Sequence, residues 1–146
     1  MPLLALHHTG LLVKDVAQAA AHYIEVLGYR IESEPIDDPG QTARVQFLRL
    51  PGATHWLELV APLGPESKLA NALTKGGGLH HLCYEVADIV AATAHFRAAG
   101  CMVVSEPVAA AAFPGRRIAW LMDRQRLLFE LLEAGPGPLG LSTLRP

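Results

Sequence analysis

The hydrophobic positions of this chain follow one order of elements twice. An apolar stretch over residues 4–13 predicts a largely buried strand, and the Ala-rich segment after it has apolar residues at helical spacing. Strand patterns follow at 29–33, 43–50 and 55–60. The second copy has an apolar stretch at 79–86, another Ala-rich helix, and strand patterns at 102–106, 117–121 and 127–132. The pattern predicts a β-α-β-β-β unit that occurs two times.

Both predicted helices carry recognisable end signals. Asp15 precedes the first helix and Asp88 the second, and aspartate is a favoured N-cap because its side chain accepts a hydrogen bond from a free backbone N–H. Gly28 and Gly100 follow them, and glycine is favoured where a helix ends in a left-handed conformation. We therefore expect one helix in each copy.

Residue identities support a tandem duplication. The pair His7-His8 recurs as His80-His81, and Leu57-Glu58-Leu59 recurs as Phe129-Glu130-Leu131. Between these points Ser33-Glu34-Pro35 recurs as Ser105-Glu106-Pro107. An ordered series of this kind is the signature of an internal repeat.

The repeat sets the predicted domain organisation. We expect one domain over residues 1–134, with a first module at 4–62, a linker at 63–77 and a second module at 78–134. Residues 135–146 form a tail rich in Pro and Gly, which we expect to be extended or poorly ordered.

Four residues at repeat-equivalent positions fit poorly as ordinary core residues. Glu58 and Glu130 fall in the middle of strands with apolar residues on both sides. A carboxylate buried there must be paired, protonated or bound to a metal, because burying it bare costs several kcal/mol. His8 and His81 likewise fall within apolar strands.

Two histidines and two carboxylates suit a divalent transition metal with mixed nitrogen and oxygen ligands. Four side-chain ligands leave coordination positions open for water or substrate oxygens, which is characteristic of a catalytic metal. Gly10 and Cys83 lie two residues beyond the histidines and would leave space beside the ion. A single buried His or Glu is more often a hydrogen-bonded core residue or an edge residue, but matched pairs favour the metal site at His8, Glu58, His81 and Glu130.

Other polar residues have competing explanations. Arg116 and Arg117 follow Pro114-Gly115 and suit either solvent or the binding of a carboxylate or phosphate. Trp56 fits packing better than substrate stacking. His7 and His80 precede the predicted ligands and should point to the opposite face, as structural or supporting residues.

Composition narrows the classes of function. A net charge of −2 without a run of Lys or Arg argues against nucleic acid as a partner. Two cysteines in apolar stretches make a disulfide framework improbable. No apolar run reaches the roughly 20 residues that span a bilayer, and the N-terminus lacks a signal peptide pattern, so we expect a cytoplasmic protein without membrane contact.

Several segments resemble the vicinal oxygen chelate superfamily, which includes the glyoxalase and bleomycin-resistance proteins, and most closely its methylmalonyl-CoA epimerase family. These segments span nearly the whole chain to about Ala134 and are Leu6-His7-His8-Thr9-Gly10, Val13-Lys14-Asp15, Glu58 to Gly64, Gly77 to Val86, and Phe129-Glu130-Leu131. The family pattern places its metal ligands at His8, Glu58, His81 and Glu130.

The resemblance implies an α+β fold in which two tandem βαβββ modules form a curved mixed sheet, a cup around a metal site. It implies one divalent ion (Co, Ni, Mn, Zn or Fe), a small-molecule substrate such as a CoA thioester, and a homodimer. The expected reaction is epimerisation: a base removes the proton next to a carbonyl, and the metal stabilises the enolate. Some epimerases have a glutamate on the third strand as the proposed base, where this chain has Val45 or Gln46. Glu85 or Glu130 would then have to serve, with Arg116, Arg117 and Trp56 as candidate substrate contacts.

Other functions share part of this pattern. A lyase of the lactoylglutathione type uses the same ligand set, and an extradiol dioxygenase usually needs only two His and one Glu. A metabolite-sequestering protein of the bleomycin-resistance type generally lacks the full ligand set. We therefore expect an epimerase, with the lyase as the main alternative.

Overall fold

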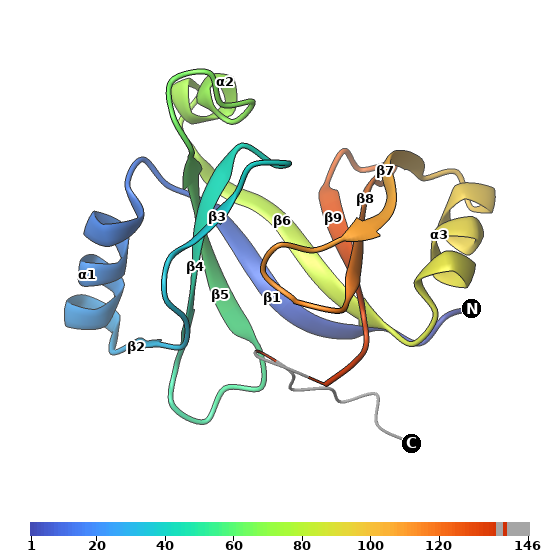
Figure 1. Cartoon of the computed structure of the whole chain (residues 1–146), viewed down its shortest axis with the longest axis horizontal. Helices are drawn as coiled ribbons and strands as arrows, with labels where there is room; N and C mark the ends of the chain where they lie inside the picture. The colour runs from blue at the N-terminus through green and yellow to red at the C-terminus, as the bar shows by residue number, and fades with distance from the viewer. Residues whose placement is uncertain (137–138, 140–146) are drawn as a thin grey trace. The chain divides into compact units, whose positions relative to one another are not determined.

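The computed structural model describes residues 1–136 and residue 139. Over these residues the chain forms nine strands and three helices, which are ordered as in Figure 1. None of the helices in this described part is long and apolar enough to cross a membrane. The chain divides into two compact units, Thr9–His80 and Met1–His8 with His81–Pro146. We call them the α1 unit and the α3 unit after the longest helix in each.

In the α1 unit, one helix packs on a small antiparallel sheet. Strand β4 (Ala43–Arg49) pairs with β5 (Trp56–Pro62) and with two short strands, β2 (Arg30–Ile31) and β3 (Ile36–Asp38). Helix α1 (Val16–Leu27) covers β4 and β5, as Figure 1 shows. The contact is a buried cluster of Ala20 with Leu48, Leu57 and Leu59.

Capping sets the ends of α1 as the sequence predicts. The Gln18 backbone N–H donates to the Asp15 side chain at 2.8 Å, and Gly28 ends the helix in the left-handed conformation with φ of 79°. A side chain other than glycine is disfavoured at that φ because its Cβ approaches the backbone carbonyl. A further helix, α2 (Ala70–Thr74), follows in the segment that joins the two copies.

The α3 unit holds the second copy of the repeat. Strand β6 (Gly78–Val86) enters it and pairs parallel with β9 (Leu128–Glu133), which pairs antiparallel with β8 (Arg117–Met122). Strand β7 (Met102–Ala109) pairs antiparallel with β8 and completes the order β6-β9-β8-β7. The first strand of the chain, β1 (Ala5–Leu12), begins in this unit and ends in the other.

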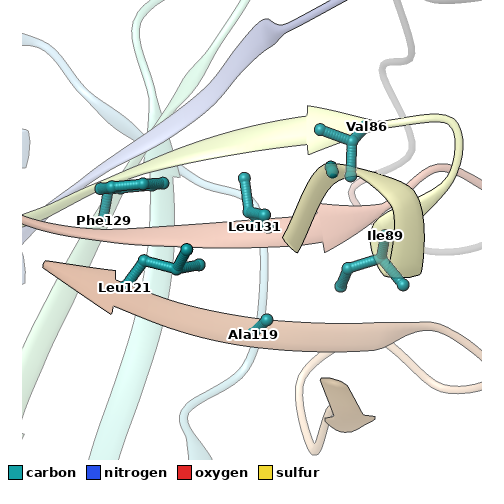
Figure 2. Close-up of a cluster of buried hydrophobic side chains, with 7 residues drawn as sticks. Val86, Ile89, Ala119, Leu121, Phe129 and Leu131 are labelled. Carbon is teal, nitrogen blue, oxygen red and sulfur yellow. The ribbon is translucent and has the colours of Figure 1, made fainter. Parts of the chain in front are cut away.

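Helix α3 (Ile89–Ala98) covers one face of these strands. Asp88 caps it by accepting from the Ala91 backbone N–H at 2.9 Å. The buried cluster between α3 and the strands, drawn in Figure 2, combines helix residues with alternate residues of β8 and β9 and with the last residue of β6. The members of this cluster are Val86, Ile89, Ala92, Ala119, Leu121, Phe129 and Leu131.

Because successive side chains of a strand point to opposite faces, the residues between these core positions lie on the other face. Register places Cys83 beside Glu130 and Trp120 on the far side of Glu130. His81 and Glu85 share that face of β6. The apolar face of this sheet therefore holds the helix, and the opposite face collects the polar residues.

The predicted α+β class is confirmed, with β-α-β-β-β in the second copy and one additional short strand, β3, in the first. The strand predicted at 29–33 is reduced to the two residues of β2, and β7 extends to Ala109, beyond the predicted end at residue 106. Most of the tail predicted at 135–146 lies outside the described residues.

Candidate metal centre

Three of the four predicted ligands converge in the α3 unit. His8 comes from β1, His81 from β6 and Glu130 from β9. The Nε2 atoms of His8 and His81 lie 3.1 Å apart, and His8 Nε2 lies 3.5 Å from Glu130 Oε1. Ligand atoms of all three residues lie within 4.8 Å of one another, and the three side chains are buried.

Neighbouring residues hold these side chains in place. Cys83, which is fully buried, is the register partner of Glu130 between β6 and β9. The Trp120 ring meets the His81 imidazole edge to face, with 4.7 Å between the centroids. The paired strands thus fix two ligands by register, and an aromatic contact orients one imidazole.

The electrostatics favour a cation between these groups. Burial holds the pKa of His8 well below its ordinary value of 6.5, and the nearby His81 and His7 lower it further. A neutral imidazole offers a nitrogen lone pair, and Glu130 offers carboxylate oxygens. This donor set fits a divalent transition ion, which accepts both imidazole nitrogen and carboxylate oxygen. His8, His81 and Glu130 therefore form a group that can hold one such ion.

Glu58 lies in the α1 unit, in the middle of β5. Its register partner on β4 is Phe47, and Trp56 and Val60 share its face of β5. The Glu58 side chain is buried at 6% exposure. A buried strand carboxylate is what the sequence predicts here, and its role as the fourth metal ligand stays a prediction.

Glu85 and Arg116 form a second buried polar group in the α3 unit. Arg116 Nη2 donates to Glu85 Oε2 at 2.8 Å, and the two side chains are 3% and 1% exposed. Arg116 Nε also donates to the Glu133 carbonyl oxygen at 2.6 Å. The guanidinium lies 5.5 Å from the centre of the Phe113 ring. Arg116 is therefore a buried, specifically held charge, unlike the solvated residue that composition alone would suggest.

Arg117 has a different environment from its neighbour. Its guanidinium forms a two-point ion pair with the Glu133 carboxylate, at 2.8 and 2.9 Å, and its side chain is 45% exposed. Hydrogen bonding and the positive charge of Arg117 lower the pKa of Glu133. A contact between Arg117 and the substrate stays a prediction.

Trp56 packs within the α1 unit. Its ring is buried, and the Arg49 guanidinium lies 5.8 Å from the ring centre. It also lines a pocket of about 230 Å³ together with Thr9, Tyr29 and His55. The packing interpretation fits the burial, and a role in substrate contact stays a prediction.

His7 has a closer connection to the centre than strand alternation predicts. Its Nδ1 lies 2.7 Å from His8 Nδ1, and its Nε2 lies 2.7 Å from the Leu139 carbonyl oxygen. The Phe113 ring meets the His7 ring edge to face at 5.3 Å. From the sequence we expect His7 to be a structural or supporting residue, and nothing in the sequence singles out Phe113. The sequence signal that could have pointed to His7 is its position directly before the predicted ligand His8.

Comparison with known proteins gives a consistent result. The family model described as Glyoxalase/Bleomycin resistance protein/Dioxygenase superfamily matches residues 7–120. The ethylmalonyl-CoA/methylmalonyl-CoA epimerase of Cereibacter sphaeroides is 41% identical over 101 residues, covering 68% of this chain and 73% of that protein. The mitochondrial methylmalonyl-CoA epimerase of Homo sapiens is 38% identical over 105 residues, covering 70% of this chain and 58% of that protein. The crystal structure of methylmalonyl-CoA epimerase from Mycobacterium tuberculosis matches with a TM-score of 0.79 at 30% identity, covering 90% of this chain and 88% of that one.

Proposed function

Because the chain belongs to the glyoxalase, bleomycin-resistance and dioxygenase superfamily, we propose that it is a metal-dependent epimerase of methylmalonyl-CoA or a similar acyl-CoA thioester. The names of its relatives support this reaction, and the convergence of His8, His81 and Glu130 carries the proposal. In an epimerase of this kind the proton next to the thioester carbonyl leaves from one face and returns to the other.

The proposed ligands are His8, His81 and Glu130, with Glu58 as the fourth. When bound, a divalent ion would act as a Lewis acid that stabilises the negative charge on the enolate oxygen. The two imidazoles contribute neutral nitrogen donors and each glutamate contributes one negative charge, so two carboxylates balance a divalent charge. We propose Co, Ni, Mn, Zn or Fe as the candidate ions.

We propose Glu130 as the main candidate for the proton acceptor. Glu85, the other candidate, is held by Arg116 at 2.8 Å in a buried setting. A proton on Glu85 would remove the negative charge that faces this guanidinium, which makes Glu85 poorly suited to that task. Glu130 has two oxygens, so one can face the metal while the other receives a proton.

The proposed substrate contacts are Arg116, Arg117 and Trp56. Arg116 supports this role best, because its Nη1 is buried and finds no hydrogen-bond partner among the described residues. A guanidinium N–H in that state could donate to an anionic group such as the free carboxylate of methylmalonyl-CoA. We also retain a cytoplasmic location as a prediction.

Exchange of the substrate proton with solvent tests this function. The metal-loaded protein, mixed with methylmalonyl-CoA in deuterated water, should incorporate deuterium at the carbon between the two carbonyl groups and interconvert the two epimers. The His81→Ala variant should show neither reaction. If the wild type leaves methylmalonyl-CoA unchanged but converts the thiol adduct of a 2-oxoaldehyde, the chain is a lyase and the proposal is wrong.

A further inference from the structure

A chain of two hydrogen bonds runs from the backbone at Leu139 to His8. His7 Nε2 lies 2.7 Å from the Leu139 carbonyl oxygen. A carbonyl oxygen can only accept a hydrogen bond, so His7 Nε2 must carry the hydrogen and donate it. The Leu139 carbonyl therefore decides which of the two His7 ring nitrogens carries the hydrogen.

The second contact joins two ring nitrogens. His7 Nδ1 and His8 Nδ1 lie 2.7 Å apart, a distance at which one of them must carry the hydrogen between them. A neutral His7 with its hydrogen on Nε2 has a lone pair on Nδ1, which accepts. His8 Nδ1 is then the donor, and the His8 lone pair sits on Nε2.

If His7 Nδ1 were instead the donor to His8 Nδ1, His7 would carry a hydrogen on both ring nitrogens and would be cationic. His7 is buried at 2% exposure among the Phe113 ring, the neighbouring His8 and Cys83. The Phe113 ring that His7 contacts also lies 5.5 Å from the Arg116 guanidinium. A cationic His7 would therefore place a second positive charge in a buried site near Arg116, which disfavours this arrangement.

The consequence concerns the atom that faces the metal centre. His8 Nε2 lies 3.1 Å from His81 Nε2 and 3.5 Å from Glu130 Oε1. We propose that His7 is a positioning residue that fixes His8 as its Nδ1–H tautomer, with the Nε2 lone pair ready to bind the metal. This inference rests on the metal centre of the proposed function and adds a specific residue that supports it. Supporting hydrogen bonds to a ligand histidine commonly change metal affinity by about 10–100-fold.

The tautomer can be measured before any metal is added. Nitrogen-15 NMR of histidine-labelled, metal-free protein should show His8 with a protonated Nδ1 and an unprotonated Nε2 at neutral pH. In His7→Phe, which keeps a ring but has no acceptor, the His8 proton should shift toward Nε2. A wild-type His8 found with its hydrogen on Nε2 would overturn the proposal without any reference to catalysis.

Metal affinity provides the second test. Titration with Co²⁺, followed by its visible absorption, should show about 10–100-fold weaker binding by His7→Phe than by wild type. His7→Asn should recover most of the affinity, because its side-chain oxygen can accept near the position of Nδ1. His22→Phe changes an exposed histidine of α1 in the same way and should bind like wild type.

Equal Co²⁺ affinity of His7→Phe and wild type would refute the role of His7. Failure of the wild type to bind Co²⁺ would instead refute the metal centre of the proposed function, and the tautomer measurement would still decide the assignment at His8. If His7→Phe does not fold, the wild-type spectrum and His7→Asn decide: His7→Asn with a wild-type His8 tautomer supports the proposal, and one with the hydrogen on Nε2 refutes it.

Discussion

The residues of the candidate centre differ in how visible they are in the sequence. His81 and Glu130 stand out because each has a repeat-equivalent partner, and a polar residue that recurs within an apolar strand requires a common explanation. The structure brings these two together with His8. His7 is harder to assign, because strand alternation places it opposite His8 and its carbonyl partner, Leu139, lies far along the chain. Contacts between distant segments of that kind leave no local pattern.

Glu130→Gln tests the residue with the most demanding proposed role. The amide keeps the shape of the side chain but removes its charge and its ability to accept a proton. We expect epimerisation to fall by about 10²–10⁴-fold and Co²⁺ binding to weaken, with little change in thermal stability. Activity near that of wild type would exclude Glu130 as the proton acceptor. His22→Gln, on an exposed face of α1, serves as the control substitution.

The Glu85–Arg116 pair makes a prediction about stability. Removing one member of a buried ion pair leaves the other charge uncompensated, which typically costs about 3–5 kcal/mol. We expect Arg116→Met to lower the free energy of unfolding by that amount in urea denaturation. The double variant with Glu85→Gln should be more stable than the single one, because no buried charge is left unpaired. A double variant that loses the sum of the two single effects would contradict this interpretation.

At the scale of elements, the sequence predicts the helices and strands whose positions are set by local patterns. Asp15 and Asp88 cap their helices as predicted, and the long apolar strands are found close to their expected positions. The short strand β3 was missed because Ile36–Asp38 lies between Pro35 and Pro39 and has little apolar alternation. Strand β7 continues past Pro107, and its pairing with β8 shifts register on the way. Proline is tolerated at such irregular edge positions because its missing N–H need not pair with a neighbour.

The ion pair at the end of β9 adds a pH dependence. Arg117 lowers the pKa of Glu133, so this carboxylate is charged more readily in the folded than in the unfolded chain. Its stabilising effect is complete above the unfolded pKa and is lost as pH falls through the lower, folded pKa. We expect a contribution of less than about 1 kcal/mol, since the pair is partly exposed. Urea denaturation at pH 7 and pH 3 should show a smaller stability difference for Arg117→Gln than for wild type. An equal difference would show that the pair contributes nothing.

At the scale of the whole molecule, the duplication matters more than any single motif. Each of the two copies supplies one histidine and one glutamate, and together these residues make up the predicted set of four ligands. The repeat also explains why an α+β class could be predicted from the sequence. The sequence does not specify which substrate group lies beside the centre, because that depends on loops such as residues 110–116, whose pattern has no counterpart in the first copy.

Assembly is a separate prediction at this scale. The family resemblance predicts a homodimer, and strand β7 exposes Met102, Val104 and Val108. Sedimentation velocity at micromolar concentration should give a single species of twice the chain mass. A monomer over the whole concentration range would contradict the prediction and leave the metal centre unaffected.

We propose that His8, Glu58, His81 and Glu130 bind one divalent ion together. X-ray absorption of protein loaded with Co²⁺, combined with measurement of the bound metal, tests this most directly. We expect one ion per chain, two imidazole ligands, and oxygen as every other donor, with imidazole scattering reduced in His8→Ala and His81→Ala. A protein that retains no ion after gel filtration, or an ion whose scattering is unchanged in both variants, would contradict it.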